Sequence, residues 1–99
     1  MNSRHWEVER EARERVINQI GVGVVIKSVV VDRGHRNGPE VHKITNTGII
    51  LIYNQRTNRM ITKLIARPNQ IRRYYNETEV VPNYLIELAR NHQRAGMNR

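Results

Sequence analysis

The chain has 99 residues, of which 38% are hydrophobic, contains no cysteine and carries a formal net charge of +8 at pH 7. This length allows one domain with a single core, and the absence of cysteine excludes disulfides, thiolate metal sites and a cysteine nucleophile. No apolar stretch approaches the roughly 20 residues that a membrane-spanning helix needs, and the N-terminus has no apolar signal segment. We therefore expect one cytoplasmic domain over residues 1–99, without membrane association.

The first predicted element is a helix over residues 3–20, with Ser3 as its candidate N-cap. Its apolar stripe, at i, i+4 spacing, consists of Val8, Ala12, Val16 and Ile20. The other positions alternate Glu and Arg, which is typical of solvated pairs along a helix. Gly21 and Gly23 end the helix, because glycine adopts the backbone conformations that close one.

A sheet is predicted over residues 24–67. The segment from Val24 to Asp32 is rich in β-branched residues and forms the first strand. Three further strands are predicted over residues 41–45, 49–54 and 60–67. Turn residues at 46–48 and 56–58 separate them, so the strands form an antiparallel meander of short hairpins. Pro68 stops the last strand.

After the basic and aromatic segment 70–75, a second helix is predicted over residues 82–94, with Pro82 at its start and a frayed tail over residues 95–99. The element order predicts an α+β fold, in which the N-terminal helix packs on a four-stranded antiparallel meander sheet, with a C-terminal helix. We expect the other face of the sheet to be open. Strand register decides which of six candidates lie on it. These are His42, Lys43, Tyr53, Thr62, Lys63 and Arg67.

Positive charge is concentrated in the middle of the chain. Between Gly21 and Tyr75 there are ten Lys or Arg residues against two acids, Asp32 and Glu40, whereas the flanking segments carry bases and acids in equal numbers. A cationic centre between neutral flanks favours a binding face over general solubility. We predict a polyanionic partner, with RNA favoured over DNA.

Three segments suggest a family. They are Arg4-His5-Trp6 and Arg13-Glu14-Arg15-Val16-Ile17 in the first helix, and Asn58-Arg59-Met60-Ile61-Thr62 at the end of the meander. With its helix followed by a meander, the chain resembles, over about residues 3–75, the barnase, EndoU, colicin-tRNase and RelE group of ribonuclease toxins. The resemblance implies a metal-free active site on the concave face of the sheet, built from varied sets of His, Glu, Arg, Lys, Thr and Tyr.

Cleavage of RNA through its own 2′-OH needs a base, an acid and cations that hold the charge growing on the phosphate. Glu40 and His42 are two residues apart, so within one strand they project from the same face. We predict Glu40, His42 and Lys63 as catalytic residues, with arginines as a phosphate clamp. The alternative, that Glu40 is a loop acid and His42 an exposed strand residue, stays open.

Arginine next to tyrosine offers phosphate contacts and stacking surfaces for unpaired bases. The predicted nucleic-acid-binding residues are Arg36, Arg56, Arg59, Arg67, Arg72, Arg73, Tyr74 and Tyr75. The glycine-containing loop 34–39 is open to two interpretations, a phosphate cradle or an ordinary hairpin loop. With no cysteine and one aspartate in the chain, we expect neither a metal site nor a cofactor.

Three functions are consistent with these features. The first is a metal-independent ribonuclease or toxin-like endoribonuclease, which would be matched by an acidic antitoxin or immunity protein. The second is a non-catalytic DNA- or RNA-binding regulator, and the third an inhibitor of an acidic host protein, each from a phage or mobile element. For any of these we also predict a homodimer contact through the C-terminal helix.

Overall fold

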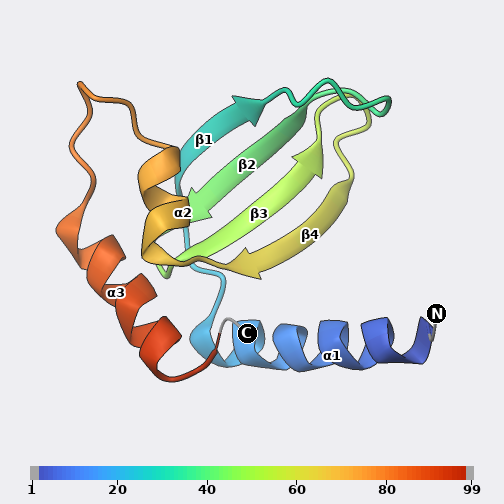
Figure 1. Ribbon diagram of the computed structural model, residues 1–99, viewed down its shortest axis with the longest axis horizontal. Coiled ribbons are helices and arrows are strands. Elements are labelled where there is room, and N and C mark those ends of the chain that lie inside the picture. The colour runs from blue at the N-terminus through green and yellow to red at the C-terminus, as the bar shows by residue number, and fades with distance from the viewer. Residues whose placement is uncertain (1–2, 98–99) are drawn as a thin grey trace.

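The computed structural model describes the backbone of residues 3–97 and the side chains of residues 7–97. The elements are α1 (Ser3–Ile20), β1 (Val25–Val31), β2 (Glu40–Thr45), β3 (Ile49–Asn54), β4 (Met60–Ile65), α2 (Pro68–Arg73) and α3 (Asn83–Arg94). The strands form one antiparallel sheet in the order β1-β2-β3-β4 (Figure 1). The predicted α+β fold, with a helix at each end of a four-stranded meander, is therefore confirmed.

Turn residues fix the register of the strands. In the β2–β3 turn, Gly48 has φ +84° and its N–H donates to the carbonyl of Thr45 at 3.2 Å. In the β3–β4 turn, the side-chain oxygen of Asn54 accepts the backbone N–H groups of Arg56 and Thr57 at 2.9 and 3.0 Å. Both turns lie where their Asn and Gly residues predict them.

One face of the sheet, which we call the α1 face, is covered in part by the C-terminal half of α1. The buried cluster there consists of Ile17, Ile49, Leu51 and Ile65. The Thr47 hydroxyl donates to the carbonyl of Gly21 at 2.7 Å and so ties the end of α1 to the β2–β3 turn. Val8, nearer the start of the helix, is 55% exposed. Only the later part of the predicted apolar stripe therefore packs on the sheet.

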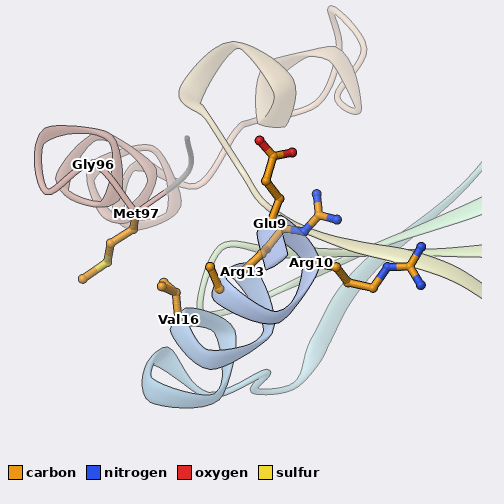
Figure 2. Close-up of a pocket in the computed structure, with 7 residues that line it drawn as sticks. Glu9, Arg10, Arg13, Val16, Gly96 and Met97 are labelled. Atoms are coloured by element: carbon orange, nitrogen blue, oxygen red, sulfur yellow. The ribbon is translucent and has the colours of Figure 1, made fainter. Parts of the chain in front are cut away.

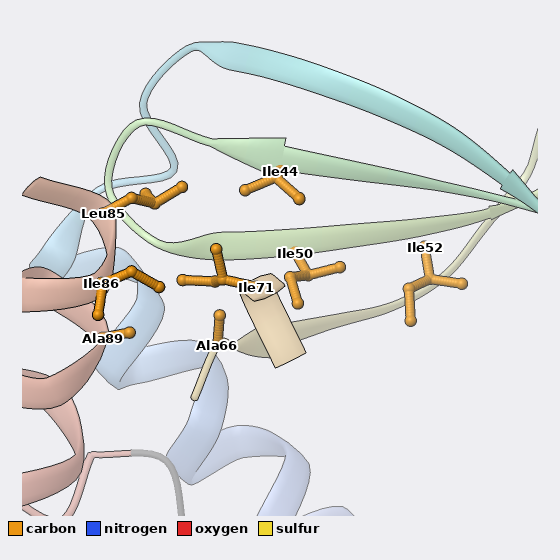
Figure 3. Close-up of a cluster of buried hydrophobic side chains, with 8 residues drawn as sticks. All are labelled: Ile44, Ile50, Ile52, Ala66, Ile71, Leu85, Ile86 and Ala89. Carbon is orange, nitrogen blue, oxygen red and sulfur yellow. The ribbon is translucent and has the colours of Figure 1, made fainter. Parts of the chain in front are cut away.

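The opposite face, the α2/α3 face, is not open as predicted, because α2 and α3 cover one end of it (Figure 3). The buried cluster consists of Ile44, Ile50, Ile52, Ala66, Ile71, Leu85, Ile86 and Ala89. Burial of each large aliphatic side chain contributes roughly 1.5–3 kcal/mol. This cluster is the larger of the two, and it fixes α2 and α3 on the sheet.

The covering helix α2 was not among the predicted elements. Pro68 is at its first turn, where the missing N–H leaves no hydrogen bond unmade. The side-chain oxygen of Gln70 reaches back to accept the backbone N–H of Arg67 at 2.8 Å. The last strand ends earlier than expected, at Ile65, and Pro68 begins a helix that turns the basic and aromatic segment back over the sheet.

Some sequence predictions lie outside the described residues. These are the side chain of Ser3, which was the candidate N-cap, the side chains of Arg4, His5 and Trp6 that entered the family resemblance, and residues 98 and 99 of the predicted tail. Within residues 3–97, no helix has the length and apolar character needed to cross a membrane.

Candidate functional site

A pocket of about 280 Å³ lies on the α2/α3 face, between α2 and the strands. Its apolar lining consists of Val29, Val31, Ile52 and Leu64. Its polar lining consists of Arg33, His42, Gln70, Arg73 and Tyr74. We call this the α2 pocket. It combines an apolar wall with a few converging polar groups, as ligand sites usually do.

Strand β2 brings Glu40 and His42 together, as their period-two spacing predicts. Both project toward the α2/α3 face, where His42 lies opposite Ile52 of β3. The His42 side chain is 1% exposed, and its Nε2 lies 2.9 Å from Oε1 of Glu40, which is 23% exposed. The predicted acid and imidazole are therefore in direct contact, with the imidazole on the inner side.

Tyr74, at the end of α2, contacts the other nitrogen of the same ring. Its hydroxyl lies 2.6 Å from Nδ1 of His42. Because a carboxylate can only accept, Nε2 of a neutral imidazole carries the proton and donates it to Glu40, which leaves Nδ1 to accept the Tyr74 hydroxyl. We call Tyr74, His42 and Glu40 the proton chain. Both ring nitrogens are occupied, so His42 exchanges protons with a ligand only through Tyr74 or Glu40.

The charge around Tyr74 is predominantly positive. Burial raises the pKa of the Tyr74 phenol, and the carboxylate of Glu40 raises it further. The guanidinium groups of Arg33 and Arg73 lower the pKa, and Arg33 has the larger effect of the two. The phenol therefore keeps its proton at neutral pH and donates it to His42. The two arginines line the same pocket and offer their donors to an anion there.

Lys63, the third predicted catalytic residue, lies on the other side of the sheet. It pairs with Leu51 in the β3–β4 register, which places both on the α1 face, and its ammonium lies 3.2 Å from the carboxylate of Glu14. Lys43 is on that face too, with its ammonium 4.8 Å from the centre of the Tyr53 ring. The sheet therefore separates Lys63 from Glu40 and His42, whereas Thr62 faces the α2/α3 side.

The predicted nucleic-acid-binding arginines fall into two groups. Arg67, Arg72 and Arg73 lie at α2. Arg36, Arg56 and Arg59 lie in what we call the loop end, residues 32–39 of the β1–β2 loop and 54–59 of the β3–β4 turn, which are adjacent in Figure 1. Of the two predicted tyrosines, Tyr74 lines the α2 pocket.

Tyr75 has a different role. The Lys27 ammonium lies 4.7 Å from the centre of the Tyr75 ring and also forms an ion pair with Glu79. These contacts hold the connection between α2 and α3 against β1. Tyr75 therefore helps to hold α2 in position and does not line the α2 pocket.

Sequence reasoning missed two polar residues of the pocket lining, Arg33 and Gln70. A signal existed for each. Arg33 closely follows β1 at the edge of the sheet, and Gln70 precedes Arg73 by three residues, a spacing that puts both on one side of a helix. Recognising α2 from Pro68 would have placed Gln70, Arg73 and Tyr74 together.

A second and larger pocket, of about 470 Å³, lies between α1 and the C-terminal end of α3 (Figure 2). Its lining consists of Glu9, Arg10, Ala12, Arg13, Val16, Gly96 and Met97. The described lining contains none of the predicted site residues and has no imidazole or phenol. We place the candidate site at the α2 pocket because His42 and Tyr74, which are in contact, both line it. Among the residues that the structure describes, no three His, Asp or Glu side chains are grouped so that they could hold a metal ion.

No protein-family model, curated protein or solved structure matches this chain. The resemblance to ribonuclease toxins therefore stays a prediction.

Proposed function

We propose that this protein is a metal-independent endoribonuclease with its active site in the α2 pocket. One observation carries the proposal: the hydrogen-bonded chain from Glu40 through His42 to Tyr74 ends in a pocket that Arg33 and Arg73 also line. Acid–base groups beside fixed cations are what RNA cleavage through the 2′-OH needs.

In this proposal, the oxygen of Tyr74 takes the proton of the attacking 2′-OH while its own proton moves to Nδ1 of His42. The imidazolium that forms is stabilised by the carboxylate of Glu40, which holds the ring in one tautomer. The 2′-oxygen attacks the phosphorus, and the bond to the 5′-oxygen breaks as water protonates that leaving oxygen. The hydroxide that forms takes back the extra proton of His42 through Tyr74, which restores the neutral imidazole. The products carry a 2′,3′-cyclic phosphate and a 5′-hydroxyl.

Arg33 and Arg73 hold the phosphate in this scheme. Their guanidinium groups carry positive charge and several N–H donors, so they neutralise the charge that grows on the phosphate oxygens as the new bond forms. RNA is the partner rather than DNA, because the attacking group is the 2′-OH.

The resemblance to the barnase, EndoU, colicin-tRNase and RelE group supports the same proposal. In this proposal the protein acts in the cytoplasm without a cofactor. An antitoxin or immunity protein would mask it, and the net charge of +8 favours an acidic one.

The test is cleavage of labelled RNA in the presence of EDTA, with single-stranded DNA as the negative substrate. We expect Tyr74→Phe to lower the rate about 10²- to 10⁴-fold, the usual contribution of a positioned acid–base group. Tyr84→Phe is the matched control, since Tyr84 is a 50% exposed tyrosine on α3. RNA should yield cyclic phosphate ends, and DNA should stay intact.

Equal activity in Tyr74→Phe and Tyr84→Phe would remove the proton chain from the mechanism. Cleavage that EDTA abolishes would replace it with a metal-dependent one. Oligonucleotide binding by Tyr74→Phe, measured alongside, separates lost chemistry from lost folding.

The second candidate is a non-catalytic DNA- or RNA-binding regulator from a phage or mobile element. The burial of His42, with both nitrogens hydrogen-bonded, favours it, because a satisfied buried histidine also serves as a structural element. Binding without cleavage by the wild type would support this function. Binding to a host protein alone would support the inhibitor function.

A further inference from the structure

The loop end contains arginines that the α2 pocket does not use. Arg36, Arg56 and Arg59 are exposed there. The one acid within these two segments, Asp32, accepts the backbone N–H of Gly34 at 2.9 Å. The loop end is therefore a strongly cationic surface, separate from the cations of α2.

The two segments of the loop end are fastened to each other. The side-chain amide of Asn54 donates to the carbonyl of Asn37 at 3.1 Å, and the N–H of Gln55 donates to the carbonyl of Pro39 at 3.0 Å. These bonds hold the β3–β4 turn against the β1–β2 loop. The backbone positions of the arginines on the turn and the loop are therefore held close to one another.

Arg56 is held in place by a glycine. Gly38 is buried with φ +88°, and a Cβ at this position would lie 2.6 Å from Nε of Arg56. The Arg56 side chain therefore lies directly on the backbone of the β1–β2 loop. An arginine packed in this way loses less side-chain entropy when it binds an anion.

The loop end continues from the α2 pocket. Arg33 belongs to the β1–β2 loop and also lines the pocket. His42 is four residues from Gly38, which is at most roughly 13 Å at about 3.3 Å per residue of fully extended chain. A strand stacked at roughly 3.4 Å per nucleotide covers that distance with about four nucleotides.

We propose that the loop end is a second phosphate-binding surface, and that the substrate is a single-stranded RNA segment long enough to reach from the α2 pocket to Arg36, Arg56 and Arg59. The inference rests on the proposed function for the pocket. It adds that a dinucleotide, which is too short to reach the loop end from the pocket, binds much more weakly than an octanucleotide. Single strands are specified because the pocket must receive an unstacked nucleotide.

The experiment measures binding of fluorescein-labelled 2′-O-methyl oligonucleotides by anisotropy at several salt concentrations. The 2′-O-methyl group blocks attack by the 2′-oxygen, so binding is read without cleavage. The test protein carries Arg36→Gln, Arg56→Gln and Arg59→Gln. The control carries Arg15→Gln, Arg90→Gln and Arg94→Gln on α1 and α3, and has the same net charge.

For the octanucleotide, we expect the slope of log affinity against log salt to fall in the loop-end variant by about 0.7 for each phosphate contact removed, or about two in all. The control should keep the wild-type slope. For the dinucleotide, the two variants should bind equally. A Gly38→Ala variant, which displaces Arg56 without changing the charge, should weaken octanucleotide binding in the same direction.

Equal slopes for the loop-end and control variants would overturn the inference, and so would equal affinity of the wild type for the two lengths. Cleavage of RNA by the wild type would leave the proposed function standing in either case. Conversely, if the salt slopes are as predicted but the wild type does not cleave RNA, the loop end is supported as a phosphate-binding surface and the ribonuclease proposal fails.

Discussion

At the scale of single residues, substitutions of Glu40 distinguish the role of its negative charge from the role of its hydrogen bond to His42. We predict that Glu40→Gln lowers the cleavage rate about 10²-fold or more, because the amide oxygen still accepts from Nε2 of His42 but no longer stabilises an imidazolium. Glu40→Ala also leaves the buried Nε2 without its partner and lowers the free energy of unfolding by about 1–3 kcal/mol.

Urea unfolding and cleavage assays on the same preparations separate the two effects. Glu87→Gln, which removes an exposed carboxylate paired with Arg90, is the control and should change neither. A Glu40→Gln variant with full activity would show that the carboxylate charge takes no part.

His92 gives the fold a dependence on pH. It is buried on α3, burial lowers its pKa below the usual value, and its Nδ1 has no hydrogen-bond partner among the described residues. The unfolded chain therefore takes up the proton first, so stability is full above about pH 6.5 and falls as the pH drops below it. We predict that His92→Leu removes this loss while keeping the stability at pH 7 within about 1 kcal/mol.

Urea unfolding at pH 7 and pH 5 tests this. The control is His35→Gln, which changes an exposed loop histidine and should retain the wild-type pH dependence. If His92→Leu loses as much stability between pH 7 and pH 5 as the wild type, another group causes that loss.

Part of the candidate site could be predicted from the sequence. Glu40 and His42 came from the two-residue period of a strand, a local rule that needs no tertiary information. Tyr74 meets His42 across 32 residues of chain, and only the packing of α2 creates that contact. Lys63 was misplaced for a related reason, because one step in register moves a side chain through the sheet.

At the scale of elements, the link between α1 and the sheet depends on a glycine. Gly23 has φ +75°, and a Cβ there would clash with Oδ1 of Asn46, which accepts the N–H of Val24 at 2.8 Å. We predict that Gly23→Ala lowers the free energy of unfolding by more than about 2 kcal/mol, since backbone strain of about 1–2 kcal/mol adds to the clash.

Gly34→Ala is the comparison that isolates strain. Gly34 has φ +71°, and a Cβ there meets nothing within 4 Å. Its loss of stability should therefore be the smaller of the two. Equal losses, measured by urea unfolding, would show that the contact with Asn46 relaxes without effect.

The strands and two of the helices followed from local signals. Asn and Gly marked the turns around β3, and the β-branched run marked β1. The element that was missed, α2, is a helix of six residues, too short for a hydrophobic period to show. The sequence signals for α2 were Pro68, which suits the first turn of a helix, and Gln70, whose side chain can reach back to the residue before that turn. From the sequence, Pro68 was interpreted only as the end of a strand.

At the scale of the whole molecule, the predicted dimer contact can be tested. The apolar face of α3, with Leu85, Ile86 and Ala89, is buried in the core of its own chain. We therefore predict a monomer of 11.7 kDa by light scattering. A dimer that Tyr84→Glu dissociates would instead place the contact on the exposed side of α3, where Tyr84 is 50% exposed.

The order in which the chain is synthesised gives the position of Tyr74 a further meaning. Residues up to Ile65 complete the sheet and carry Glu40 and His42, but the phenol that links His42 to the pocket follows α2, and α3 then covers the sheet beside it. While only the residues of the sheet have emerged from the ribosome, the nascent protein therefore lacks Tyr74 and its proton chain is incomplete. On the proposed function, the enzyme stays inactive on the messenger and ribosome that produce it until Tyr74 has emerged and α2 has packed on the sheet.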